Sequence, residues 1–367
     1  MNKFLIILAF IALLCAPGYT NNQQLNRLIC VSILVLLIRH EYKFKPQVHH
    51  YLFFAWLGWA AIGTCFSRYP MMAFYGFYPY RCDGIITYLV IVCLALCYWK
   101  TFTCIRPLCL IALLCFFTII GVYLYQAPWL NYIAKGRFDG LLLPDVALAS
   151  FACVAGIVLI HIHAGLSVIA IPVMLMTQNR TSFYAFLMVV TVYLFMKYCR
   201  HLLDYKRMMT IASCLFFVWF ALYPFIPDKM TQIPALNCTG ARCYWLLEAS
   251  NLASALPVTG FGLDSLSNYL THPEGPGYEA LLAFIPDKTH NIAYDAILET
   301  GWIGYTLLLL AFGYALAICI KHPERQNVVC IMVVIGWILY GFANPHGLLC
   351  NAVALTAFMG IRKEEIE

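Results

Sequence analysis

The sequence has little charge for its length. Only 11% of its 367 residues are Asp, Glu, Lys or Arg, whereas 63% are hydrophobic. Soluble domains carry about 25% charged residues, and so few polar side chains could not cover an aqueous surface. The shortage therefore excludes a soluble globule. The apolar runs are longer and less alternating than the ~10-residue strands of a membrane β-barrel. They indicate an all-α polytopic membrane protein, because helices satisfy their own backbone hydrogen bonds in lipid.

Several common chemical signatures are also missing. The chain has 17 cysteines, but no CxxC pair has zinc-type spacing, and Cys inside an apolar run behaves as a small hydrophobe. No HExxH motif or Ser-His-Asp arrangement indicates hydrolysis, and no DxD motif indicates a metal. The glycines of Gly260-Phe261-Gly262 lack the strand–turn–helix unit of a nucleotide site. The modest net charge of +6 does not indicate nucleic acid. We expect no cofactor, no metal and no nucleic-acid partner.

What the sequence does contain is a series of apolar runs bounded by charged residues or by Pro and Gly. They predict about twelve transmembrane helices, at 3–17, 25–40, 50–66, 84–99, 104–125, 144–162, 164–177, 181–198, 208–226, 294–320, 326–343 and 346–361. The first run could also be a signal peptide, but a retained helix completes a consistent topology. The runs 144–162 and 164–177 could also form one broken helix, which would move every later loop across the membrane.

The positive charge predicts the orientation. With a cytoplasmic N-terminus, fourteen of the 23 Lys and Arg residues fall in inner loops, as the positive-inside rule requires. One broken helix at 144–177 would instead place the basic cluster 197–207 outside. We therefore expect both termini in the cytoplasm and a periplasmic loop subdomain at 227–290. This loop divides the chain into helices one to nine (1–226) and helices ten to twelve with a cytoplasmic tail (291–367).

Three arginines lie at the ends of predicted helices on the outer side: Arg137, Arg180 and Arg242. A planar guanidinium matches phosphate oxygens in a bidentate manner, which an ammonium does less well. These residues could therefore hold a diphosphate. They could equally lie at the membrane interface or pair with nearby acidic residues. Arg180 is the strongest candidate, because its short loop contains no acidic neighbour.

His290 and Asn291 stand just before the apolar run 294–320. A histidine beside a membrane helix is more often structural than catalytic. A neutral imidazole at the water–lipid boundary can nevertheless act as a general base, because its pKa lies near ambient pH. Asn291 could cap the helix or orient a substrate. Cys238 and Cys243 flank Arg242 in the outer loop and could form a disulfide, an alternative that the sequence leaves open.

The order of these residues resembles the superfamily of O-antigen ligases and O-antigen polymerases. The superfamily signature includes R-x-x-x-W, P-x-x-G-x-G and H-N-x7-E-x-G-x-x-G. The corresponding residues here are Arg242 and Trp245 at a slightly shorter spacing, Pro257, Gly260 and Gly262, and then His290, Asn291, Glu299, Gly301 and Gly304. The resemblance extends over about residues 137–305. The family often has Ser before its first arginine and Gly after it, whereas this chain has Asn179 and Thr181.

The resemblance implies a GT-C-like, inverting and metal-independent glycosyltransferase of the bacterial inner membrane, with a periplasmic active site and a role in lipopolysaccharide biosynthesis. Its donor would be a glycan on undecaprenyl diphosphate, held by Arg180, Arg242 and Arg137, and His290 would deprotonate the acceptor hydroxyl. The acceptor is a lipid A core sugar in ligases and a second lipid-linked unit in polymerases. The single long outer loop favours a ligase, with a polymerase as the alternative. A non-catalytic lipid or solute transporter is a further alternative, although the paired, broken helices typical of transporters are not visible in the sequence.

Overall fold

The computed structural model describes most of the predicted helical segments and only parts of the long outer loop. The described residues are 2–15, 23–38, 45–76, 83–102, 104–126, 145–177, 179–198, 214–215, 218, 249–253, 255–266, 289, 291–342 and 348–363. Within these ranges the fold is all-helical and contains no strand, which confirms the predicted all-α class. The chain divides into two compact units. Unit 1 comprises Met1–Lys45, Leu89–Met209 and Ala315–Glu367, and unit 2 comprises Pro46–Tyr88 and Thr210–Tyr314.

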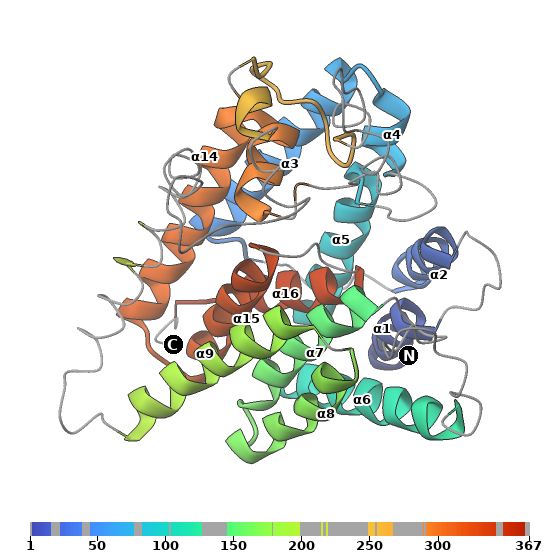
Figure 1. Ribbon diagram of the computed structural model, residues 1–367, viewed down its shortest axis with the longest axis vertical. Helices are drawn as coiled ribbons and strands as arrows, with labels where there is room; N and C mark the ends of the chain where they lie inside the picture. Colours follow the sequence, from blue (N-terminus) through green and yellow to red (C-terminus); the bar gives the residue numbers. More distant parts are fainter. Residues whose placement is uncertain are drawn as a thin grey trace, which may run out of the picture. The chain divides into compact units, whose positions relative to one another are not determined.

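The helices follow the apolar runs of the sequence within a few residues (Figure 1). Their bounds are α1 Asn2–Cys15, α2 Gln23–Leu37, α3 Val48–Phe66, α5 Ile85–Phe102, α6 Arg106–Gln126, α7 Asp145–Leu159, η2 Ala164–Ile169, α8 Ala170–Met176, α9 Arg180–Tyr198, α14 Ile292–Lys321, α15 Arg325–Gly341 and α16 Leu348–Met359. One short helix, α4 (Pro70–Tyr75), lies where the sequence predicted only a loop. The predicted helix 208–226 falls almost wholly outside the described residues.

Helix α14 alone, among the described residues, has both the length and the apolar composition to cross a membrane. Shorter apolar stretches occupy α1, α2, α5 to α9, α15 and α16. Many large apolar side chains on these helices are exposed, such as Leu36 at 82% and Phe117 at 63%. Exposed apolar surface of this kind suits a lipid environment.

Helix α7 is the central element of unit 1. It packs against α6, α8, α9, α15 and α16 (Figure 1). Every described side chain from Ala147 to Leu159 is buried, which is typical of a helix that other helices surround. Small residues permit this close packing. A Cβ at Gly156, for example, would lie 2.6 Å from the Cβ of Ala170 and 2.9 Å from the ring of Phe186.

Several turns of unit 1 meet at one end of the helices. The chain turns after α7, and η2 and α8 pack back against that helix. Nη2 of Arg325, at the start of α15, donates to the carbonyl oxygens of Ile160 and Ile162 at 3.2 and 3.1 Å. The guanidinium of Arg362, just after α16, lies 4.8 Å from the ring of Trp99 in α5. The topology derived from charge assigns these same turns to one side of a membrane.

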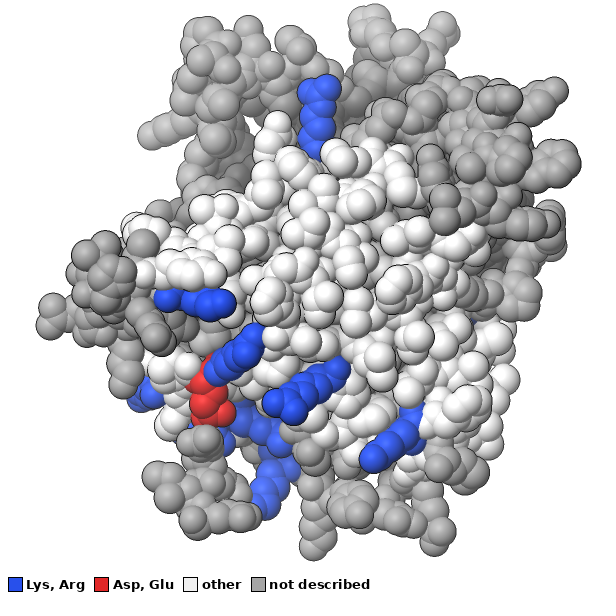
Figure 2. All heavy atoms as spheres, turned by 90° about the horizontal axis from the view of Figure 1, so that it is seen from below, with Lys and Arg blue, Asp and Glu red and all other residues white. Residues whose placement is uncertain are grey.

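Positive charge concentrates at these turns. Figure 2 shows a face on which Lys and Arg far outnumber Asp and Glu among the described residues. Arg325 and Arg362 both lie at such turns of unit 1, and the positive-inside rule expects basic residues in inner loops.

Candidate functional site

The centre of the candidate site is a break in α14 at Gly301. This glycine has φ 70° and ψ 175°, so the helical hydrogen bonds stop there and restart beyond it. Residues 298 to 300 therefore present carbonyl oxygens as they would at the end of a helix. Each accepts a bond from another segment of unit 2. The donors are N–H of Phe261 to Leu298 (2.7 Å), N–H of Gly262 to Glu299 (3.0 Å), and Nε1 of Trp59 to Thr300 (2.8 Å).

Two motif glycines make this docking possible, because they remove side chains where two backbones meet. A Cβ at Gly260, which has φ 75°, would lie 2.5 Å from the carbonyl carbon of Glu299 and 2.6 Å from the nitrogen of Gly301. A Cβ at Gly301 would overlap the carbonyl oxygen of Val258. Both glycines also have positive φ values that other residues rarely adopt. The P-x-x-G-x-G turn and the E-x-G break therefore form one interlocked unit.

The carboxylate of Glu299 fastens the next part of this turn. Its Oε1 accepts the backbone N–H of Asp264 at 2.9 Å, and Glu299 itself is only 5% exposed. Asp264 has φ 53°, an uncommon conformation for a residue other than glycine. Oδ2 of Asp264 in turn accepts the N–H of Asp83 at 3.2 Å. A buried carboxylate is costly unless it is hydrogen-bonded, so these bonds give Glu299 a clear structural role.

Helix α3 holds the other side of the turn. Oγ of Ser67, just beyond the helix, donates to the carbonyl oxygen of Phe261 at 2.5 Å. A Cβ at Gly63 would lie 2.7 Å from the carbonyl oxygen of Thr259, so the helix backbone approaches the turn closely here. A Cβ at Gly262 would meet Ser67 and the methyl group of Ala73 in α4. The turn is thus enclosed by α3, α4 and α14.

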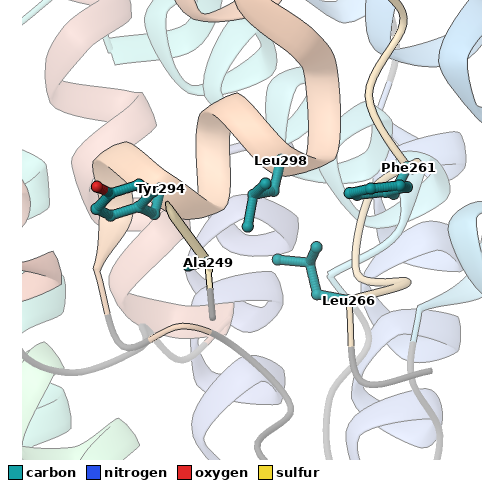
Figure 3. Packing of buried hydrophobic residues seen from close by; sticks show 5 residues of the cluster. All are labelled: Ala249, Phe261, Leu266, Tyr294 and Leu298. Atoms are coloured by element: carbon teal, nitrogen blue, oxygen red, sulfur yellow. The ribbon is translucent and has the colours of Figure 1, made fainter. Parts of the chain in front are cut away.

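A small apolar cluster supports the first turns of α14. Tyr294 and Leu298 face Ala249 and Leu266, with Phe261 beside them (Figure 3). All five side chains are at most 9% exposed. Burying a large apolar side chain contributes roughly 1.5–3 kcal/mol. This cluster and the docked carbonyls together fix the segment 292–300 within unit 2.

The start of α14 is capped on both sides of position 290. Oδ1 of Asn291 accepts the N–H of Ala293 at 3.0 Å and that of Tyr294 at 3.3 Å. Before position 290, the N–H of Thr289 donates to Oδ1 of Asp295 at 2.8 Å. Asn291 is completely buried, and its Nδ2 makes no hydrogen bond with any described residue. Asn291 is therefore the N-cap of α14.

The start of α9 is capped in a similar way. Oδ1 of Asn179 accepts the N–H of Ser182 at 3.1 Å, and the Ser182 hydroxyl donates to the carbonyl oxygen of Asn179 at 2.8 Å. Nδ2 of Asn179 donates to the hydroxyl of Tyr340 in α15 at 3.3 Å. Arg180 follows as the first residue of the helix, and its side chain is exposed. Asn179 thus supplies the cap that a serine would supply, and adds a bond to α15.

The structure brings together three of the predicted site residues: Gly260, Gly262 and Glu299. Asn291 belongs to the same unit, whereas Arg180 belongs to unit 1. The remaining predictions lie outside the described residues, namely His290, Arg242, Trp245, Arg137, Cys238 and Cys243. Their roles remain predictions.

Several residues that build the site were not predicted from the sequence. Trp59 and Ser67 reach the motifs from a segment more than 190 residues earlier, and no local signal identifies them. Thr289 and Asp295 could have been found, since polar residues around the start of an apolar run are typical of helix caps.

Comparison with known families identifies the segment that contains these features. Residues 165–309 match the family model described as O-antigen ligase. This segment is similar to the O-antigen ligase family. No curated protein matches the sequence. Proteins of the O-antigen ligase family are membrane proteins and glycosyltransferase-like enzymes that act on lipid-linked glycans.

The matched segment includes the start of α9, the P-x-x-G-x-G turn and the broken part of α14. It ends before the last turns of α14 and does not include Arg137. Trp59 and Ser67 also lie outside the matched residues, although they bind the motifs directly. The interlocked unit around Gly301 is therefore completed by a helix outside the family segment.

Proposed function

We propose that this protein is an O-antigen ligase of the bacterial inner membrane. It transfers a glycan from undecaprenyl diphosphate to a sugar hydroxyl of the lipid A core at the periplasmic face. The chain crosses the membrane twelve times, with both termini in the cytoplasm. The observation that carries this proposal is the match of residues 165–309 to the O-antigen ligase family, since that segment contains the capped starts of α9 and α14.

The proposed reaction is an inverting displacement at the anomeric carbon. His290 takes the proton of the acceptor hydroxyl as its oxygen attacks, and the bond from the anomeric carbon to the diphosphate oxygen breaks. Arg180, Arg242 and Arg137 bind the diphosphate and stabilise the charge that develops on it. A diphosphate whose charge is neutralised in this way is a good leaving group, so the step does not require a metal.

The support from the structure concerns placement of the backbone. Asn291 is the N-cap of α14, so position 290 immediately precedes the positive end of a helix. Arg180 occupies the first helical position of α9, where the helix N-terminus adds to the attraction for an anion. Gly260, Gly262 and Glu299 bind no substrate in this proposal, because their contacts hold the turn to α14.

The test of the proposed function is glycan transfer by purified protein in lipid vesicles, with an undecaprenyl-diphosphate-linked glycan as donor and lipid A core as acceptor. His290→Ala should reduce transfer by at least about 100-fold, because general-base catalysis contributes about 10²–10⁴-fold. His322→Ala is the matched control, since His322 directly follows the last residue of α14. It should transfer normally. Normal transfer by His290→Ala would overturn the assignment of the base.

Glycan analysis of a deletion strain separates a ligase from a polymerase. Loss of all long glycan from the lipid A core supports the ligase. A core that carries a single repeat unit supports the polymerase instead.

A further inference from the structure

Position 290 lies between two residues that are fastened to the same helix. The hydroxyl of Thr289 donates to Oδ1 of Asp295 at 2.7 Å, and the N–H of Thr289 donates to that same oxygen at 2.8 Å. The N–H of Asn291 donates to Oγ of Thr289 at 3.2 Å. Thr289 is 1% exposed and Asn291 is 0% exposed. The buried hydroxyl of Thr289 therefore connects Thr289 to Asn291, and Oδ1 of Asp295 holds Thr289 to α14.

Asp295 is well placed to act as such an anchor. It lies in the first turn of α14, where a negative charge is favoured by the helix dipole. Its N–H donates to the carbonyl oxygen of Asn291 at 2.8 Å, which is the first hydrogen bond of the helix. Hydrogen bonds to a charged acceptor are stronger than hydrogen bonds between neutral groups. The carboxylate therefore joins the residue before position 290 to the rigid part of unit 2.

The need for an anchor follows from the place of residue 290 in the chain. A residue that precedes an N-cap makes no intrahelical hydrogen bond, so the helix does not fix its backbone. A general base must lie within hydrogen-bond reach of the proton that it removes, and a displacement of about 1 Å can cost about 10²-fold in rate. The bonds of Thr289 and Asn291 hold the chain on either side of position 290 to α14.

We infer that Asp295, acting through Thr289, is a positioning residue for His290. The inference rests on the proposed function, because it matters only if His290 is the base. Asp295 touches neither donor nor acceptor in this scheme. Its contribution is to the rate of the chemical step, not to donor binding.

The test measures kcat and KM of transfer for Asp295→Ala and Asp295→Asn. Asp295→Ala removes both bonds to Thr289 and should lower kcat by about 10- to 100-fold, with KM for the donor changed by less than about 3-fold. Asp295→Asn keeps an oxygen acceptor and should retain kcat within about 3-fold of wild type. Glu324→Ala, which removes a carboxylate at the N-cap of α15, is the control and should leave kcat unchanged.

A measurement of donor binding distinguishes a role of Asp295 in positioning His290 from a role in stabilising the helix. Binding of undecaprenyl diphosphate should be equal for His290→Ala and for the double variant with Asp295→Ala. A double variant that binds at least 10-fold more weakly would show that Asp295 maintains the fold of the site, and would overturn the inference. Wild-type kcat in Asp295→Ala would overturn it as well. Failure of the proposed function is distinguishable from both outcomes, because His290→Ala would then transfer normally or the wild-type protein would not transfer at all.

Discussion

The starts of α9 and α14 are both capped by an asparagine, but the candidate functional residue follows the cap in α9 and precedes it in α14. Each begins with an asparagine whose side-chain oxygen accepts the N–H of a residue in the first turn. In α9 the candidate residue, Arg180, follows the cap and belongs to the helix. In α14 the candidate residue, His290, precedes the cap. The hydrogen bonds of a helix fix the backbone of a residue that follows the cap. A residue that precedes the cap needs bonds from other groups to be fixed.

The two asparagines also differ in their amide nitrogens. Nδ2 of Asn179 donates to Tyr340, and this bond ties α9 to α15. Nδ2 of Asn291 is buried without a hydrogen bond to any described residue. One amide therefore joins two helices, whereas the other donates to no residue that the structure describes.

The largest effect is expected from Gly301→Ala, because α14 depends on a break two turns after its start and α9 does not. A Cβ at Gly301 would overlap the carbonyl oxygen of Val258 at a positive φ. The strain alone costs about 1–3 kcal/mol, so little folded protein should be recovered in detergent. Size-exclusion chromatography and the melting temperature measure this loss.

Gly58→Ala in α3 is the matched control for this substitution. A Cβ at Gly58 has no atom within 4 Å. The control should therefore be neutral or slightly stabilising, by up to about 1 kcal/mol. A normal melting temperature for Gly301→Ala would show that the break is not required.

The second prediction concerns the residue that α9 presents. Arg180→Lys keeps the charge but loses the planar, bidentate donor, so the rate of transfer should fall by about 10-fold or more. The same assay on Arg106→Lys is the control, because Arg106 starts α6 at a turn that the topology assigns to the other side. Equal rates for Arg180→Lys and wild type would indicate that Arg180 acts only as an interfacial charge.

Replacing each capping asparagine with aspartate tests the roles of the two amide nitrogens. A carboxylate keeps the capping oxygen and removes the amide donor. Asn291→Asp should therefore lower kcat by about 10-fold with the melting temperature nearly retained, whereas Asn179→Asp should change kcat by less than about 3-fold. Similar kcat losses in both variants would contradict a special role for the Asn291 amide. Kinetics and thermal unfolding, measured on the same preparations, provide the comparison.

The smallest effect is expected from Tyr340→Phe. The change removes the acceptor for Nδ2 of Asn179 at 3.3 Å but keeps the buried ring. The start of α9 should loosen slightly, and KM for the donor should rise by about 2- to 3-fold with kcat unchanged. Tyr184→Phe, at an exposed position of α9, is the control. An unchanged KM in Tyr340→Phe would show that the bond does not affect Arg180.

Much of the helical layout could be predicted because it depends on local sequence. Apolar runs bounded by charge placed α1 to α3, α5 to α9 and α14 to α16 within a few residues. The number of membrane crossings remains a prediction, because only α14 meets the length and composition of a crossing helix within the described residues. Helix α4 was missed, since its six residues carry no periodic signal.

The motif spacing selected Gly260, Gly262 and Glu299, and the structure places these three residues around the break in α14. The spacing could not assign their roles, because a motif does not say which atoms meet. Glu299 bonds the backbone of Asp264, and Gly260 lies against the backbone of residues 299 to 301.

The sequence alone determined the all-α class, the positions of the described helices and the family that the central segment matches. These properties depend on composition and on short motifs, both of which are local. Only the tertiary structure decided how the motifs are joined, because each bond spans a long separation in the chain. Gly301 interrupts a helix locally, but the carbonyl oxygens that it frees are bound by Phe261, Gly262 and Trp59 only after the chain has folded.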